Sequence, residues 1–80
     1  MNWENEARRI VRVELVSRSL TYAKLATRLK KAGIEETERS IANKMSRGTF
    51  SFIFFLQCMK VMGVKTINLE PPKDVDSKSR

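Results

Sequence analysis

The chain contains no histidine and only one cysteine, Cys58. Without histidine it lacks the most common metal ligand and the most common general base. A single cysteine forms no internal disulfide and no cysteine-based zinc site. Cys58 falls within an apolar stretch, where a small core residue is the expected role, and no pair of carboxylates stands apart from helix starts. We therefore expect a protein that is not an enzyme and has no cofactor, metal or small-molecule substrate.

The sequence also lacks an apolar run long enough to cross a membrane. Its most hydrophobic stretch, residues 50–62, is too short to span a bilayer and contains Lys60. The first six residues are polar and acidic apart from Met1 and Trp3, which is unlike a signal peptide. These features favour a cytoplasmic protein without a membrane partner.

What the sequence does contain is positive charge. Eighty residues make one small domain, and the 41% hydrophobic content is that of a folded, soluble protein. The formal net charge is +7, and between Arg39 and Leu69 there are five basic residues and no acidic one. Such a surface attracts polyanions, with nucleic acid the first candidate and acidic lipid or an acidic protein after it.

Apolar spacing predicts a first helix over residues 3–19. Apolar residues recur there every three or four positions, and Val11 and Leu15 widen the stripe. The expected core stripe consists of Trp3, Ala7, Ile10 and Val13. The basic residues of this helix could bind phosphate, but solvated charges are the favoured interpretation. They are Arg8, Arg9, Arg12 and Arg18.

Two shorter helices follow. The second is predicted over residues 22–31, with Thr21 as its N-cap, Gly33 at its end and Ile34 folding back onto it. The third is predicted over residues 37–47. Thr37 is its expected N-cap and Gly48 its expected stop, and Ile41 and Met45 lie four apart on its apolar side.

The fourth helix is predicted over residues 50–62, with Thr49 or Ser51 as its cap and Gly63 at its end. Apolar side chains cover more than half of its circumference. Its polar stripe consists of Gln57 and Lys60, with Ile53 between them. A helix of this kind is either the central helix of the domain or meets a second chain with part of its surface.

Residues 64–69 alternate apolar and polar side chains, as a strand buried on one face would. A lone strand needs a partner, so this segment would lie against the helices or pair with another subunit's copy. Pro71 and Pro72 end the domain. We therefore predict a domain over residues 1–70 and a flexible tail over residues 71–80.

The third helix has an outward face rich in hydrogen-bond donors. Arg39, Asn43, Ser46 and Arg47 point away from its apolar side, and Ser40 and Lys44 flank them. Arginine suits guanine edges, asparagine suits adenine, and lysine and serine suit bases or phosphates in the major groove of DNA. An ordinary solvated helix face is the alternative interpretation.

Two stretches resemble known families. Residues 21–26, TYAKLA, resemble the opening of the helix-turn-helix in the lambda-repressor-like class. Asn43, Arg47 and Gly48, followed by a hydrophobic helix ending in MGV, resemble its later half. Residues 39–50, RSIANKMSRGTF, more closely resemble a group of short uncharacterised bacterial domains, and the resemblance covers residues 3–69. The resemblance of this group to repressor domains implies DNA binding.

These observations predict an all-α fold: a compact four-helix domain with a helix-turn-helix and a short C-terminal extended segment. The turn is expected to be lengthened, because Gly33 comes seven residues after Ala26 where the lambda-repressor-like pattern has about four. The leading hypothesis is a DNA-binding transcriptional regulator that reads double-stranded DNA with helix 37–47. A homodimer would form through helix 50–62 and segment 64–69. The predicted DNA-binding residues are Thr21, Tyr22, Lys24, Arg39, Ser40, Asn43, Lys44 and Arg47.

Two other functions compete with this one. A small protein-interaction module, an adaptor or antitoxin-like partner, would use helix 50–62 and segment 64–69, and its basic charge would serve an acidic partner protein. Binding of RNA or DNA by charge alone ranks last. Trp3 and Tyr22 are the only tryptophan and tyrosine, and the phenylalanines are expected to be buried, so few rings remain for stacking on single strands.

Overall fold

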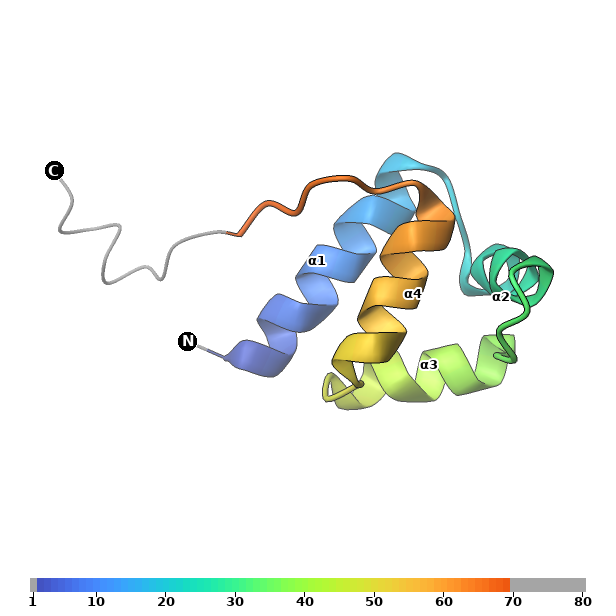
Figure 1. The fold of residues 1–80 in the computed structure, drawn as a ribbon. Coiled ribbons are helices and arrows are strands. Elements are labelled where there is room, and N and C mark those ends of the chain that lie inside the picture. Colours follow the sequence, from blue (N-terminus) through green and yellow to red (C-terminus); the bar gives the residue numbers. More distant parts are fainter. Residues whose placement is uncertain (1, 70–80) are drawn as a thin grey trace, which may run out of the picture.

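The computed structural model describes residues 2–69. They form an all-α domain of four helices, which confirms the predicted fold class (Figure 1). The helices are α1 (Trp3–Ser17), α2 (Tyr22–Lys31), α3 (Glu38–Arg47) and α4 (Phe52–Met62). α1 and α4 lie side by side, and α3 crosses the end where α4 begins and extends towards α2 (Figure 1). The predicted tail, residues 71–80, lies outside the described residues.

Each helix begins at a residue whose side chain accepts the backbone N–H three positions later. The acceptors are Asn2, Thr21, Thr37 and Ser51, with donor–acceptor distances of 2.9 to 3.1 Å. Such a bond satisfies one of the amides that a helix start leaves without a partner. The predicted caps Thr21 and Thr37 are confirmed. Of the two candidates for α4, Ser51 is the cap.

The predicted ends of α2, α3 and α4 are also confirmed. Gly48 and Gly63 are the C-caps of α3 and α4, and both have left-handed backbone angles. After α2, the amide of Ile34 donates to the carbonyl of Leu29 at 2.9 Å, and the Ile34 side chain packs against the core. The six residues 32–37 connect α2 to α3.

The core draws side chains from all four helices, and α1 contributes only part of the predicted stripe, with Ala7 and Ile10 half-buried. Val11 and Leu15 are buried, whereas Trp3 is 67% exposed and Val13 is 49% exposed. The prediction that Trp3 and Val13 belong to the core stripe is therefore wrong. α1 carries apolar residues on several sides, so its own periodicity does not select one side. Its packing against α4 makes that selection. The core residues are Val11, Leu15, Leu25, Leu29, Ile41, Met45, Phe54, Cys58, Met59 and Met62.

α1 is also shorter than predicted. It ends at Ser17 rather than at Ser19, which adopts a left-handed φ of 55°. The amide of Leu20 then donates to the carbonyl of Leu15 at 2.9 Å, a bond that closes the last turn. Ser19 therefore takes the left-handed conformation after α1, as Gly33 does after α2.

α4 is not enclosed on all sides, and one of its faces is open to solvent. Phe52 is 70% exposed, which contradicts the expectation that the phenylalanines are buried. Residues 64–69 form an extended segment but no strand, and most of them are exposed. The carbonyl of Asn68 accepts a hydrogen bond from Arg9 at 3.1 Å, which holds this segment to α1. Within residues 2–69, none of the helices has the length and hydrophobicity required to cross a membrane.

Candidate nucleic-acid interface

The outward face of α3 consists of polar side chains placed opposite two core residues. Ile41 and Met45 are 0% and 1% exposed, which fixes the rotation of the helix. Arg39, Asn43 and Arg47 are exposed on the opposite side, and no hydrogen bond or ion pair within residues 2–69 involves their side chains. We call these three residues the α3 outer face. Their donors are available to a partner molecule.

Ser40 and Lys44, also predicted to contact DNA, are engaged within the protein. The Thr37 amide donates to Ser40 Oγ at 2.9 Å, completing a reciprocal cap, and Ser40 Oγ donates to Glu36 Oε1 at 2.6 Å. Lys44 Nζ donates to Glu36 Oε2 at 2.6 Å and lies 5.0 Å from the centre of the Phe54 ring. The structure therefore places these two side chains beside the start of α3 rather than on its outer face.

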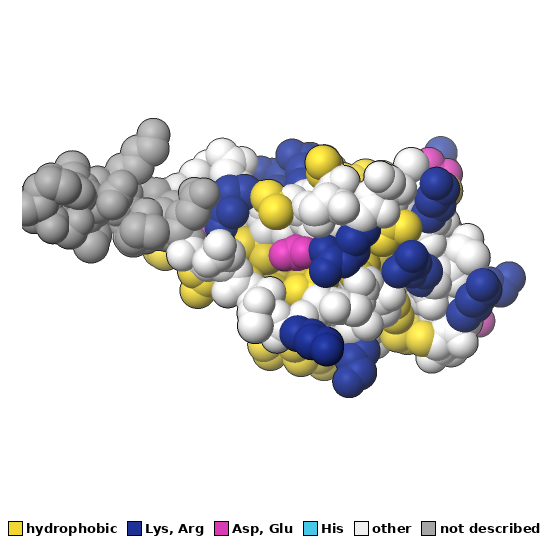
Figure 2. Space-filling view, turned by 90° about the horizontal axis from the view of Figure 1, so that it is seen from above, with side chains coloured by type: hydrophobic (Ala, Val, Ile, Leu, Met, Phe, Trp, Pro, Cys, Tyr) yellow, Lys and Arg dark blue, Asp and Glu magenta, His cyan; other side chains and the backbone are white. Residues whose placement is uncertain are grey.

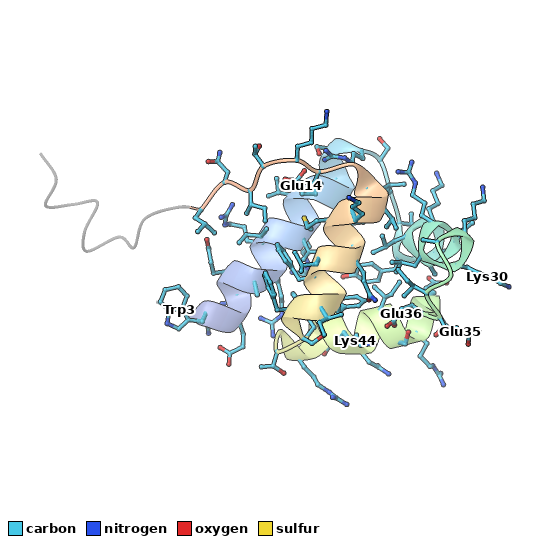
Figure 3. All side chains as sticks on the ribbon, viewed as in Figure 1. Trp3, Glu14, Lys30, Glu35, Glu36 and Lys44 are labelled. Atoms are coloured by element: carbon cyan, nitrogen blue, oxygen red, sulfur yellow. The ribbon has the colours of Figure 1, made fainter. Side chains whose placement is uncertain are left out.

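The carboxylate of Glu36 faces inward, towards Lys44 (Figure 3). Burial acts to raise the pKa of Glu36, but hydrogen bonds from Lys44 and Ser40, together with the charge of Lys44, outweigh it and hold the pKa below its usual value. This acid is consequently paired with a cation and adds little unpaired negative charge near the α3 outer face. Glu35 and Glu38, its neighbours, are exposed.

The start of α2 brings together the other three predicted contacts. The hydroxyl oxygen of Thr21 accepts the Lys24 amide at 3.1 Å, so its proton remains available as a donor. Tyr22 is half-buried against the core, and the Lys24 side chain is exposed. Backbone phosphates of DNA are commonly held by such helix starts and short polar side chains.

Arginine side chains bind the C-terminal carbonyls of two helices. Arg8 donates from Nε to the carbonyl of Met45 and from Nη2 to that of Ser46, both at 2.8 Å. Arg18 Nε donates to the carbonyl of Met62 at 2.8 Å. Arg28 Nη1 donates to the carbonyl of the preceding residue, Val61, at 3.3 Å. Last-turn carbonyls are without helical partners and carry partial negative charge, so these bonds satisfy them and favour the cation.

The expectation that the α1 arginines are solvated is thus wrong for Arg8 and Arg18. Arg9 also has partners, because it donates to the carboxylate of Glu6 at 2.8 Å and to the carbonyl of Asn68. Arg12 differs from the other three. It is exposed, and no hydrogen bond or ion pair of its side chain occurs within residues 2–69.

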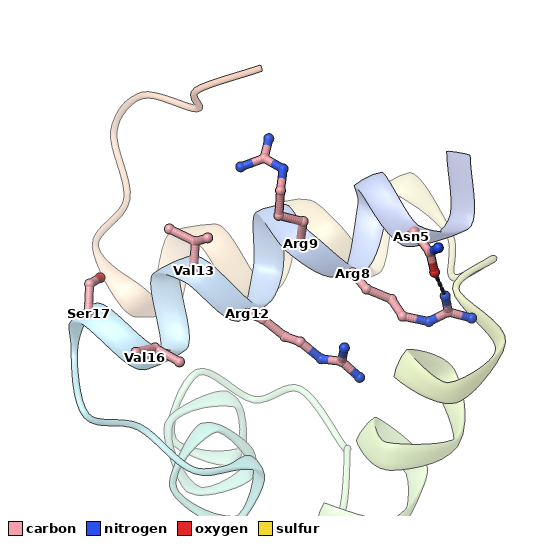
Figure 4. Close-up of a pocket in the computed structure, with 7 residues that line it drawn as sticks. All are labelled: Asn5, Arg8, Arg9, Arg12, Val13, Val16 and Ser17. Carbon is pink, nitrogen blue, oxygen red and sulfur yellow. Dashed lines mark hydrogen bonds between the residues drawn. The ribbon is translucent and has the colours of Figure 1, made fainter. Parts of the chain in front are cut away.

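Arg12 extends towards the side of the molecule where α2 and α3 lie (Figure 4). It lines a surface groove of about 630 Å³ whose seven residues all belong to α1. It also lines a second groove of about 270 Å³, together with Thr21 and Tyr22 at the start of α2. Arg12 is therefore an available cation beside two of the predicted phosphate contacts. The sequence alone does not distinguish Arg12 from the other arginines of α1.

Positive charge alone does not mark one site. Figure 2 shows lysine and arginine side chains distributed over the visible face and separated by apolar and uncharged groups. The three-residue α3 outer face is identified instead by its availability and by its position opposite the core.

Cys58 is 0% exposed and lies in the core, as predicted. Burial, followed by the charge of Glu36, raises the pKa of the Cys58 thiol to about 12. A thiol is nucleophilic as its thiolate, which is scarcely present at neutral pH when the pKa is that high.

The chain matches one family over residues 3–67, and that family is described as Domain of unknown function (DUF6471). The match spans most of the chain, so the protein belongs to this family. No curated protein and no solved structure gives a significant match. Membership of an uncharacterised family agrees with the sequence prediction, while the lambda-repressor-like resemblance stays a prediction.

Proposed function

We propose that this protein binds double-stranded DNA by inserting the α3 outer face into the major groove. The observation that carries the proposal is the availability of Arg39, Asn43 and Arg47, which are exposed opposite the buried Ile41 and Met45. Arginine and asparagine are the side chains that form bidentate bonds to guanine and adenine. α3 would act as the reading helix, and transcriptional regulation would be the biological role.

The start of α2 would hold the DNA backbone in this arrangement. Thr21 and Lys24 offer a hydroxyl proton and an ammonium group, and Arg12 adds a guanidinium from α1. The order of the contacts, phosphates at the second helix and bases at the third, is that of helix-turn-helix proteins. The net charge of +7 and the resemblance of residues 21–26 to the lambda-repressor-like class support the same proposal.

Ser40 and Lys44 have a different role in this proposal. Both bond to Glu36, so either would lose an internal partner if it turned to a base. We assign them to the stability of the start of α3. This divides the predicted contacts on α3 into three that face DNA and two that position the helix.

The test is fluorescence-polarisation binding to random duplex DNA across a salt series. The variant Arg39→Ala/Asn43→Ala is compared with Lys65→Ala/Asn68→Ala, which removes one cation and one amide from exposed positions on the extended segment. Wild-type affinity should fall steeply with salt, with a slope of about −0.9 for each phosphate contact. The α3 variant should bind several-fold more weakly, because it loses a cation and two hydrogen-bonding side chains from the surface that enters the groove. The control variant should retain most of the wild-type affinity.

A protein-interaction module is the second candidate, favoured by the open apolar face of α4, where Phe52 and Ile53 are 70% and 67% exposed. The same experiment separates the two. If wild-type protein fails to bind duplex DNA even at low salt, DNA binding is rejected and the α4 face becomes the bait for protein partners. Equal loss in both double variants would show that charge, not the α3 outer face, drives binding.

A further inference from the structure

One side of α4 is apolar and open to solvent. Phe52 is 70% exposed, Ile53 is 67% exposed and Leu56 is 48% exposed. Lys60 is exposed as well, and it shares this side because positions 52, 56 and 60 recur every four residues along the helix. We call these four residues the α4 outer face. It lies opposite the core side of the helix, where Cys58 is fully buried.

This apolar surface continues beyond α4. An open groove of about 450 Å³ begins at Phe52 and is bordered by Ile10 of α1 and by Ile67 and Leu69 of the extended segment. Leu69 is 70% exposed and Ile67 is 41% exposed. Single exposed apolar side chains are ordinary on protein surfaces, but a continuous group of them marks an interaction site.

Charge indicates where two copies of this chain could meet. Two copies of a chain with a net charge of +7 repel each other, so they can meet closely only where few charges lie. α4 contains a single charged residue, Lys60, whereas each of α1, α2 and α3 carries several. Residues 70–80 are poor candidates to fill the groove, because Val75 is their one large aliphatic residue.

We propose that two copies of this chain pair through the α4 outer face, with the two α4 helices antiparallel and Leu56 at the two-fold axis. In such a pair, position 52 of one copy faces position 60 of the other, because both are four residues from the centre. Lys60 of each copy would then lie over the Phe52 ring of its partner, a cation–π contact. The chain already contains one contact of this kind, between Lys44 and Phe54.

A parallel pair is less favourable. It would place the two copies of Lys60 beside each other, and like charges in an interface disfavour association. An interface of standard size buries about 800 Å² on each partner. The α4 outer face with Ile67 and Leu69 is a small set of side chains, so weak pairing with a dissociation constant on the order of micromolar is expected. This pairing does not depend on DNA, because the α4 outer face and the α3 outer face share no residue.

The first test measures self-association by sedimentation equilibrium. Leu56→Glu should raise the dimer dissociation constant about a hundredfold, since it places two carboxylates at the axis. The matched control is Val16→Glu, which introduces the same charge at a 77% exposed position of α1 and should leave the dimer unchanged. Both replaced side chains are substantially exposed, so both variants should keep the wild-type circular dichroism and melting temperature.

The second test measures the register by disulfide cross-linking under mild oxidation. Leu56→Cys should form a covalent dimer with itself, because a two-fold axis brings the same position of both copies together. Phe52→Cys mixed with Lys60→Cys should cross-link, while Phe52→Cys alone should not. Wild-type protein is the control, because its one thiol, at Cys58, is 0% exposed.

Three outcomes would overturn the proposal. Wild-type protein that stays monomeric at millimolar concentration has no such interface. Efficient self-linking of Lys60→Cys, without the mixed product, would contradict the antiparallel arrangement. Monomeric wild-type protein that binds phosphatidylserine vesicles through the same residues, and loses binding in Leu56→Glu, would assign the α4 outer face to an acidic lipid surface.

Discussion

Lys44 on α3 donates a hydrogen bond at 2.6 Å to the carboxylate of Glu36, eight residues earlier in the connection from α2. Eight residues is too far for a contact within one turn of helix, so this bond links the connection to the body of α3. Ser40 donates to the same carboxylate, one turn before Lys44. These two hydrogen bonds explain why Ser40 and Lys44 do not belong to the α3 outer face.

The first prediction concerns pH. Glu36 has a pKa below its ordinary value of 4.5 in the folded protein, so its interactions stabilise the fold above that pH. Glu36→Gln should lower the free energy of unfolding by about 1 kcal/mol at neutral pH, because a partly exposed charged hydrogen bond is lost. The difference from wild type should shrink as the pH falls below 4.5 and disappear below the folded-state pKa.

Urea unfolding at a series of pH values measures this difference. Glu35→Gln is the matched control, since it removes the same charge from the exposed neighbouring position. A difference between wild type and Glu36→Gln that stays constant from neutral pH to pH 3 would contradict the assigned role of the carboxylate.

The second prediction concerns the close approach of α1 to the end of α3. Gly48 has a φ of +72°, and a Cβ there would lie 2.8 Å from Glu4 Cβ and 3.0 Å from Arg8 Nη2. Gly33 has a φ of +82° but open space around it. Gly33→Ala should therefore lower the free energy of unfolding only by the left-handed backbone penalty, about 1–2 kcal/mol. Gly48→Ala should lower it by at least about 1 kcal/mol more, because α1 must also shift. Equal losses in urea unfolding would show that α1 does not constrain this position.

The third prediction concerns the arginine that joins these two helices. Arg8→Ala should lower the free energy of unfolding by about 1–2 kcal/mol, because two last-turn carbonyls of α3 lose their donors. Arg8→Lys should lose less stability than Arg8→Ala but remain less stable than wild type, since one ammonium group cannot reproduce the planar fork of a guanidinium. Arg12→Ala, on the same helix, should change stability by less than about 0.5 kcal/mol. Thermal unfolding ranks the three variants, and an Arg12→Ala loss as large as that of Arg8→Ala would be inconsistent with the structure.

The fourth prediction extends the proposed DNA binding to α1. Arg12 lines the same groove as Thr21 and Tyr22, so it should contact a phosphate that the start of α2 also holds. Arg12→Ala should then reduce the slope of log affinity against log salt by about 0.9, equally for all sequences. Lys65→Ala, which removes a cation from the extended segment, should leave the slope unchanged. If wild-type protein binds DNA and Arg12→Ala keeps the full slope, α1 lies outside the interface.

Spacing alone predicted where α2 and α3 begin and where α2, α3 and α4 end, and it reduced the cap of α4 to two candidates. Thr21, Thr37 and Ser51 cap amides only three residues away, and glycines end α2, α3 and α4, so these features depend on local geometry that spacing predicts. The core sides of α2 and α3 were likewise predictable, because each of these helices has a single apolar stripe.

The packing of the helices was needed to show which part of the α1 stripe is buried and which polar side chains are available. α1 has apolar residues on several sides, and its contact with α4 selects Val11 and Leu15 rather than Trp3. Arg8 and Arg12 are the same residue type one turn apart, yet only Arg8 reaches carbonyls on α3, 37 and 38 positions away in the chain. Such contacts depend on the relative placement of whole helices, which no local pattern contains.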